Sequence, residues 1–266
     1  NKASFLINSN KLVEALPALE EALQLGEQLL EMAGSYKNWT LMGKIQANLG
    51  MSYFGMEQYD LSMDAFNHAE DIVHLHLKEQ NSYEVAISIG IYCFFKARIL
   101  RRLRQVDQAE TLLLDKISFM EEQIETAKRE DLRAQLAELR ETLAEVYFVQ
   151  GRYDESLTSI VHAENMLERI VVEEDQNDSQ VLYARIAFKA FVMFYAAGDK
   201  QKAMQKGVSS LALWKQISDD RKWTPDETVQ NLNTVVAEFM ENLELFKRED
   251  DIAKIQLAMK TIGKKF

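Results

Sequence analysis

Apolar residues recur three and four positions apart over long stretches of the chain, the pattern that marks one buried face of an α-helix. In residues 132–150 this face consists of Leu132, Leu136, Leu139, Leu143, Val146 and Tyr147. A short turn at Gly151 and Arg152 follows, and a second amphipathic stretch begins at Tyr153. The pattern predicts two antiparallel helices joined by a tight turn.

The same two-helix pattern returns every 47 residues without insertion or deletion. Four stretches that begin at Ser52, Ile99, Val146 and Met193 align column by column. One column holds only small residues, which are Ser62, Ala109, Ser156 and Ala203. A fixed register over several copies is typical of stacked helical repeats, because one helix pair cannot bury both of its faces alone.

This register predicts an all-α fold, a right-handed α-α superhelix (solenoid) of antiparallel helix pairs with a 47-residue period. We expect a single domain over residues 1–266, since no composition shift interrupts the register. Its parts are a partial first repeat at 1–35, full repeats at about 36–80, 81–128, 129–176 and 177–220, and a C-terminal helix pair at 224–266. The last pair fits the columns only loosely.

The composition supports a helical chain and excludes some classes of partner. The 266 residues include only 2 Pro and 10 Gly, so β-sandwiches and barrels, which need frequent turn residues, are excluded. A net charge of −11 argues against nucleic acid as a partner of this domain. No apolar run reaches the ~20 residues of a membrane span and no signal peptide is visible, so we expect a cytoplasmic protein without a membrane partner.

The residues that carry enzyme chemistry are present without the spacing that such chemistry needs. His74 and His76 are two positions apart and point to different helical faces, so they make a poor metal pair. The single cysteine, Cys93, lies among aromatics and is expected to be a buried, inert thiol. The acidic run 173–175 is interpreted as a solvated loop. We therefore expect no enzyme, cofactor or metal.

Several stretches resemble the tetratricopeptide repeat. The segment Leu49-Gly50-Met51-Ser52-Tyr53 matches the first-helix element of that family, and Gly151-Arg152-Tyr153-Asp154-Glu155-Ser156 matches its turn and second helix. The family repeat is usually 34 residues long, so the 47-residue period implies longer helices, similar to the variants in bacterial regulatory and sensor proteins. The resemblance implies a concave groove lined by first-helix residues.

The family columns assign a binding groove for a protein or peptide to the first helices. One column is aromatic at residues 54, 148 and 195 and basic at 101. The candidate groove residues are Phe54, Phe94, Arg98, Arg101, Arg102, Glu145, Phe148, Arg185, Lys189 and Tyr195.

Two interpretations of the charged columns stay open at this point. Basic and acidic rows on neighbouring helices pair with each other and set the stacking register, each pair contributing ~0–1 kcal/mol. Alternatively, the arginines and lysine bind carboxylates of a ligand while the aromatics take its apolar side chains. The carboxylate clamp of the family's chaperone-binding members is disfavoured, because Ala47 and Met51 stand where Lys and Asn are needed.

The sequence thus predicts a non-enzymatic scaffold that binds a protein or peptide. One alternative is a ligand- or peptide-responsive sensor domain of a larger bacterial regulator, such as a transcription factor or signalling enzyme. A second alternative is self-association, for example as a homodimer, through an exposed terminal repeat.

Overall fold

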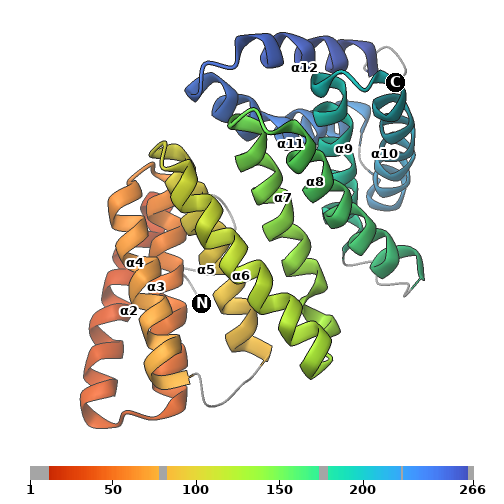
Figure 1. Ribbon diagram of the computed structural model, residues 1–266. Helices are drawn as coiled ribbons and strands as arrows, with labels where there is room; N and C mark the ends of the chain where they lie inside the picture. The colour runs from red at the N-terminus through yellow and green to blue at the C-terminus, as the bar shows by residue number, and fades with distance from the viewer. Residues whose placement is uncertain (1–11, 78–82, 174–178, 223, 263–266) are drawn as a thin grey trace. The chain divides into compact units, whose positions relative to one another are not determined.

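The computed structural model describes residues 12–77, 83–173, 179–222 and 224–262 (Figure 1). All regular structure in these ranges is helical, which confirms the predicted all-α class. Residues 1–103 form one compact unit and residues 104–266 form a second. A single continuous array over the whole chain stays a prediction.

In the part of the first unit that the structure describes, four long helices pack in chain order. They are α2 (Leu12–Met32), α3 (Tyr36–Gly55), α4 (Tyr59–Ile72), which continues into a π-helical turn (Val73–Leu77), and α5 (Tyr83–Arg102). Helix α3 contacts both α2 and α4, and α4 also contacts α5. Ser35 caps the N-terminus of α3, where its side chain accepts a hydrogen bond from the backbone N–H of Asn38.

The second unit contains the remaining helices. They are α6 (Val106–Ala127), a 3₁₀ turn (Glu130–Leu132), α7 (Arg133–Val149), α8 (Tyr153–Glu168) with a π-helical turn (Arg169–Glu173), α9 (Gln180–Ala197), α10 (Lys200–Arg221), α11 (Pro225–Leu245) and α12 (Glu249–Ile262). Helices α7 and α8 form one close pair, and α9 and α10 form another. A core that includes Phe148, Phe188 and Phe239 joins α7, α9 and α11.

Small residues let the two helices of a pair approach closely. In the first unit, a Cβ atom on Gly50 of α3 would lie 2.8 Å from the Phe66 ring of α4. The Ser62 hydroxyl donates a 2.7 Å hydrogen bond to the Gly50 carbonyl oxygen. In the second unit, the Ser156 hydroxyl donates the same bond to the Ala144 carbonyl, also at 2.7 Å. Ser62 and Ser156 belong to the small column that the register identified.

The turn inside each pair repeats with the sequence period. A positive φ occurs at Glu57 (60°), Arg104 (60°), Gly151 (81°) and Gly198 (97°), each 47 residues after the one before. The equivalent turn before α12 has its positive φ at Lys247 (56°), two residues later than the register places it. The 47-residue period is therefore confirmed over four turns, and the last pair uses the same turn in a displaced register.

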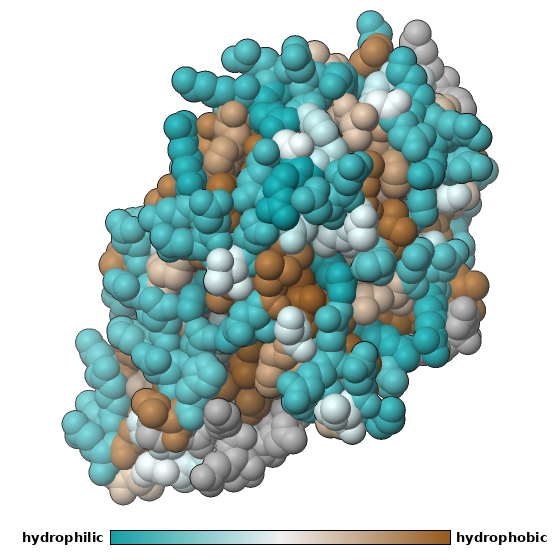
Figure 2. Space-filling view, viewed as in Figure 1, coloured by the Kyte–Doolittle hydropathy of each residue, from teal (hydrophilic) through white to brown (hydrophobic). Residues whose placement is uncertain are grey.

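Most of the face drawn in Figure 2 is polar, with small apolar patches between the charged side chains. Among the described residues, no helix is long and apolar enough to span a bilayer.

Candidate binding surfaces

The ten candidate groove residues divide equally between the two units. Phe54, Phe94, Arg98, Arg101 and Arg102 lie on α3 and α5 of the first unit. Glu145, Phe148, Arg185, Lys189 and Tyr195 lie on α7 and α9 of the second unit. The candidates of the two units lie in surroundings of different chemistry.

In the first unit, Arg98 is surrounded by aromatic rings. Its guanidinium carbon lies 4.7 Å from the centroid of Phe54, 4.9 Å from that of Phe94 and 5.8 Å from that of Phe95. The Phe54 and Phe95 rings meet edge to face with centroids 5.5 Å apart. Arg98, Phe54, Phe94 and Phe95 are all partly exposed. We call these four residues the arginine–aromatic cluster.

Helix geometry explains how this cluster forms. Phe94 and Phe95 precede Arg98 by four and three residues on α5, so their side chains share a face with it. Phe54 reaches the same place from the last turn of α3. Phe95 was not among the predicted residues, although its position three residues before Arg98 in an aromatic run was the available signal.

The arrangement suits recognition of a carboxylate beside an apolar group. Stacking engages the flat face of a guanidinium, whereas its hydrogen bonds come from N–H groups at the edge, in a fork that matches a carboxylate. The rings also restrict the rotamers of Arg98, which lowers the entropy lost on binding. Two further arginines follow in the last turn of α5: Arg102 is partly exposed, and Arg101 is buried.

In the second unit, the charged rows of α7 and α9 pair with each other. Arg185 Nη2 lies 2.6 Å from a Glu141 oxygen and 3.2 Å from a Glu138 oxygen. Lys189 Nζ lies 2.6 Å from Glu141 and also contacts Glu145. Glu141 (2% exposed), Glu145 (3%) and Lys189 (7%) are buried. We call Glu138, Glu141, Glu145, Arg185 and Lys189 the ion-pair ladder. Its geometry agrees with the first interpretation of the charged columns, in which neighbouring helices pair with each other.

Electrostatics in the ladder favour the charged form of Arg185. Burial alone lowers the pKa of its guanidinium, but the neighbouring carboxylates of Glu141 and Glu138 raise it by more, so the net shift is upward. The guanidinium of Arg185 therefore stays charged in the ladder, which joins α7 to α9.

The two aromatic candidates of this unit differ in exposure. Phe148 is fully buried, with its ring edge to face against Tyr153 at 4.9 Å and against Phe239 of α11 at 5.2 Å. Tyr195 is partly exposed, and its ring centroid lies 6.3 Å from that of Phe191. Of the five candidates here, only Tyr195 and Arg185 have appreciable exposure.

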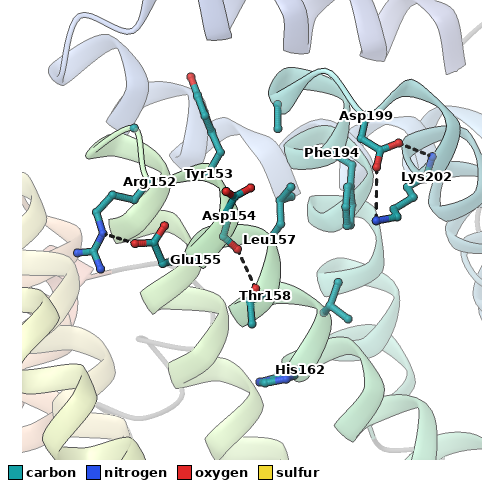
Figure 3. Close-up of a pocket in the computed structure, with 13 residues that line it drawn as sticks. Arg152, Tyr153, Asp154, Glu155, Leu157, Thr158, His162, Phe194, Asp199 and Lys202 are labelled. Atoms are coloured by element: carbon teal, nitrogen blue, oxygen red, sulfur yellow. Dashed lines mark hydrogen bonds and ion pairs between the residues drawn. The ribbon is translucent and has the colours of Figure 1, made fainter.

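A further pocket of about 740 Å³ opens beside α8, between this helix and the turn from α9 to α10 (Figure 3). Its apolar lining consists of Leu157, Val161, Phe194 and Ala197. Arg152 pairs with Glu155 at 3.0 Å on one side, and Lys202 pairs with Asp199 at 3.6 Å on the other, as Figure 3 shows. First-helix columns could not find this pocket, because most of its residues lie on second helices.

Among the described residues, few side chains outside these surfaces could react or bind a metal ion. No set of three or more His, Cys, Asp and Glu in the described ranges is placed to hold a metal ion. Cys93 is buried at 2% exposure. The side chain of His76 and the acidic run 173–175 lie outside the described side chains.

The comparisons with known proteins point to one class of fold. The tetratricopeptide repeat sequence model matches residues 43–72, which cover most of α3 and all of α4. The apo form of RapI superposes with a TM-score of 0.62 at 14% identity, over 99% of this chain and 97% of that one. BtubC (BKLC) from P. vanneervenii gives a TM-score of 0.62 at 13% identity, over 95% and 90%.

A third structure, a Rap protein complexed with Competence and Sporulation Factor, gives a TM-score of 0.59 at 14% identity, over 99% of this chain and 73% of that one. No curated protein matches the chain at a significant level. Helix pairs in a 47-residue register define a helical repeat protein. Within that class, residues 43–72 match the tetratricopeptide repeat model, and the solved structures share the helical fold of the chain.

Proposed function

We propose that the chain is a non-enzymatic scaffold that binds a protein or peptide on its first-helix faces, with Arg98 as the main anchor. The observation that carries the proposal is the arginine–aromatic cluster, in which three rings hold one guanidinium at a partly exposed site. A side chain preorganised in this way is a typical binding hot spot. No feature of the described residues favours a reaction over binding.

The chemistry of the cluster defines the ligand. The ligand carries a carboxylate for Arg98, supported by Arg102 from the next turn of α5, and an apolar side chain for the rings of Phe54 and Phe94. In the second unit, Tyr195 contacts the ligand, because Arg185 is already paired with Glu138 and Glu141. Glu145, Phe148 and Lys189 are buried there, so they position the helices.

The likeness to a solved complex supports a binding role. The Rap protein complexed with Competence and Sporulation Factor shows that a protein with this helical fold holds a bound factor. At 14% identity the likeness extends to the fold alone. The binding residues of the present chain are therefore argued from its own clusters.

The test is selection of binders from a displayed random-peptide library on the wild-type chain, followed by affinity measurement with variants. We expect Arg98→Ala to weaken the selected peptides about 30-fold, the scale of a hot spot. Arg102→Ala should have a smaller effect. Lys37→Ala removes an exposed cation from α3 and serves as the matched control, with unchanged affinity. Helical circular dichroism should be the same in all variants.

If Arg98→Ala bound the selected peptides as tightly as the wild type, the proposed anchor would be wrong. Peptides without an acidic residue among the selected binders would contradict the ligand chemistry. The affinity measurements decide the first outcome, and the sequences of the selected peptides decide the second.

The proposal includes self-association as a second candidate, favoured by one surface. Helix α2 exposes Leu25 (52%), Leu29 (41%) and Met32 (83%) at three- and four-residue spacing. An apolar stripe of this kind is a typical helix-packing face. Light scattering should show a concentration-dependent dimer that Leu29→Lys abolishes, and a monomer at every concentration would exclude it.

A further inference from the structure

The C-terminal helix pair packs differently from the other pairs of the second unit. Helices α8 and α10 each pack on their own first helix, α7 and α9. Helix α12 instead packs mainly on α9, and α11 contacts α7 in addition to α9 and α10. In Figure 1, α12 runs across the ends of the second unit's helices. The pair is thus splayed over the first-helix face of α7 and α9.

The residues at the helix crossing explain the splaying. The hydrogen bond from the Arg248 N–H to the Leu243 carbonyl (2.9 Å) has the place of the bond from Arg152 to Tyr147 (2.9 Å). Counting from these turns, Met240 and Ile252 stand where α7 and α8 have Ala144 and Ser156. Two large side chains at the crossing prevent the close approach that small residues allow.

One polar contact, which we call the clasp, fixes the start of α12 to the turn between α7 and α8. The Tyr153 hydroxyl lies 2.8 and 2.9 Å from the two carboxylate oxygens of Asp251. Arg248 Nε donates to Asp251 at 2.8 Å, and Arg248 Nη1 donates to the Val149 carbonyl at 3.3 Å. Asp251 is buried at 2% exposure, and these partners satisfy its carboxylate oxygens.

The body of α11 combines an apolar anchor with an unsatisfied polar group. The Phe239 ring packs edge to face on Phe148, a residue of the predicted groove column. Asn242 is fully buried, and neither of its amide atoms has a hydrogen-bond partner in the described structure. An unsatisfied buried amide favours any state in which water reaches it. The clasp thus adds a polar attachment to the apolar packing of the pair, in which Phe239 and Leu243 of α11 and Ile255 of α12 are buried.

We infer that α11 and α12 form a cover that opens separately from the rest of the second unit and occupies the α7–α9 face until a ligand displaces it. The matching ligand is an amphipathic helical peptide with an aromatic anchor, because α11 fills the face with such a helix. The displacement rests on the proposed function, whereas the opening does not. The two parts have separate tests.

Hydrogen–deuterium exchange of the full chain tests the opening. In the wild type, backbone amides of 230–262 should exchange through an opening that leaves α9 and α10 protected. Arg248→Met breaks the clasp, and we expect exchange of 230–262 at least tenfold faster. Asn242→Leu replaces the unsatisfied amide with an apolar side chain of similar size, so exchange there should be about tenfold slower. Exchange of α9 and α10 should not change in either variant.

The two variants are expected to change the exchange rate of 230–262 in opposite directions, which makes the result decisive. If 230–262 exchanged together with α7–α10 in all three proteins, the C-terminal pair would be an integral part of one cooperative unit and the inference would be wrong. A clasp variant that accelerated exchange in every helix of the second unit equally would overturn it as well.

A synthetic peptide of residues 231–245 tests the displacement. We expect it to bind the Arg248→Met protein at least tenfold more tightly than the Asn242→Leu protein, because the first exposes the face and the second keeps it covered. The same peptide with Phe239→Ala is the matched control and should bind at least tenfold more weakly. Equal binding to both proteins would overturn displacement. Arg98→Ala should not affect this peptide, so the result is independent of the test of Arg98.

Discussion

Arg98 of α5 and Glu145 of α7 occupy the same column of the repeat, 47 residues apart, and have different surroundings. Arg98 lies partly exposed among three aromatic rings of its unit. Glu145 is buried and paired with Lys189. The side chains that surround a column position, and not the position alone, decide whether its residue stacks on rings at a partly exposed site or joins two helices.

Removing the cation of the ladder should have the largest effect on stability. Lys189→Met leaves Glu141 and Glu145 buried without their shared partner, and we expect a loss of about 3–5 kcal/mol in the free energy of unfolding. Arg98→Met removes the stacking of a guanidinium on three rings at a partly exposed site and should cost about 1 kcal/mol. Urea denaturation of both variants measures the difference, and equal losses would contradict the assignment of different roles.

The helix crossings offer a second contrast between the units. Gly50 of α3 faces the large Phe66, whereas the equivalent Ala144 of α7 belongs to a pair that has Ile160 in the Phe66 column. Gly50→Ala places a Cβ atom 2.8 Å from the Phe66 ring and should destabilise the first unit by about 1–3 kcal/mol. Adding Phe66→Ile gives the first unit the isoleucine that the second unit has in this column, and it should restore most of the lost stability.

Gly43→Ala is the matched control for this substitution. Its Cβ atom would lie 3.6 Å from Ile72, an ordinary contact, so the better helix propensity of alanine should stabilise α3 by about 0.5–1 kcal/mol. Thermal unfolding compares the three variants. Stabilisation by Gly50→Ala would show that the crossing has room that the structure does not indicate.

Sequence alone could predict the regular part of the fold because each column has one physical requirement. Ser62 and Ser156 had to be small to let helices cross, and Gly151 and Gly198 had to accept a positive φ. The displaced turn before α12 carried no such signal. Lys247 adopts the left-handed conformation that glycine marks elsewhere, so the two-residue shift was invisible.

The candidate surfaces were less predictable for a different reason. The charge at a column does not identify its partner, and the two carboxylates that pair with Lys189 lie 44 and 48 residues away in the chain. The sequence therefore left pairing and ligand binding as alternatives. Phe95 and the pocket beside α8 were missed because the family columns assign neither of them to the groove.

The smallest effect is a dependence on pH that has opposite signs at two glutamates of α8. Burial raises the pKa of Glu164 above its usual range, although Lys206 at 2.6 Å lowers it in part. The pKa of the exposed Glu155 is lowered, first by a hydrogen bond from the backbone N–H of Glu155 itself and then by Arg152. A raised folded-state pKa means that ionised Glu164 destabilises the fold as pH rises through that pKa. A lowered one means that Glu155 stabilises the fold above its unfolded pKa.

Glu164→Gln should therefore stabilise the protein at neutral pH by less than about 1 kcal/mol, because Lys206 already offsets part of the burial cost. The gain should vanish below about pH 4, where glutamate is protonated in the unfolded chain. Glu155→Gln should slightly destabilise at neutral pH, and this loss should also vanish as pH falls. Denaturant midpoints from pH 3 to 8 measure both curves, and a gain for Glu164→Gln that persisted at pH 3 would assign its effect to packing rather than to charge.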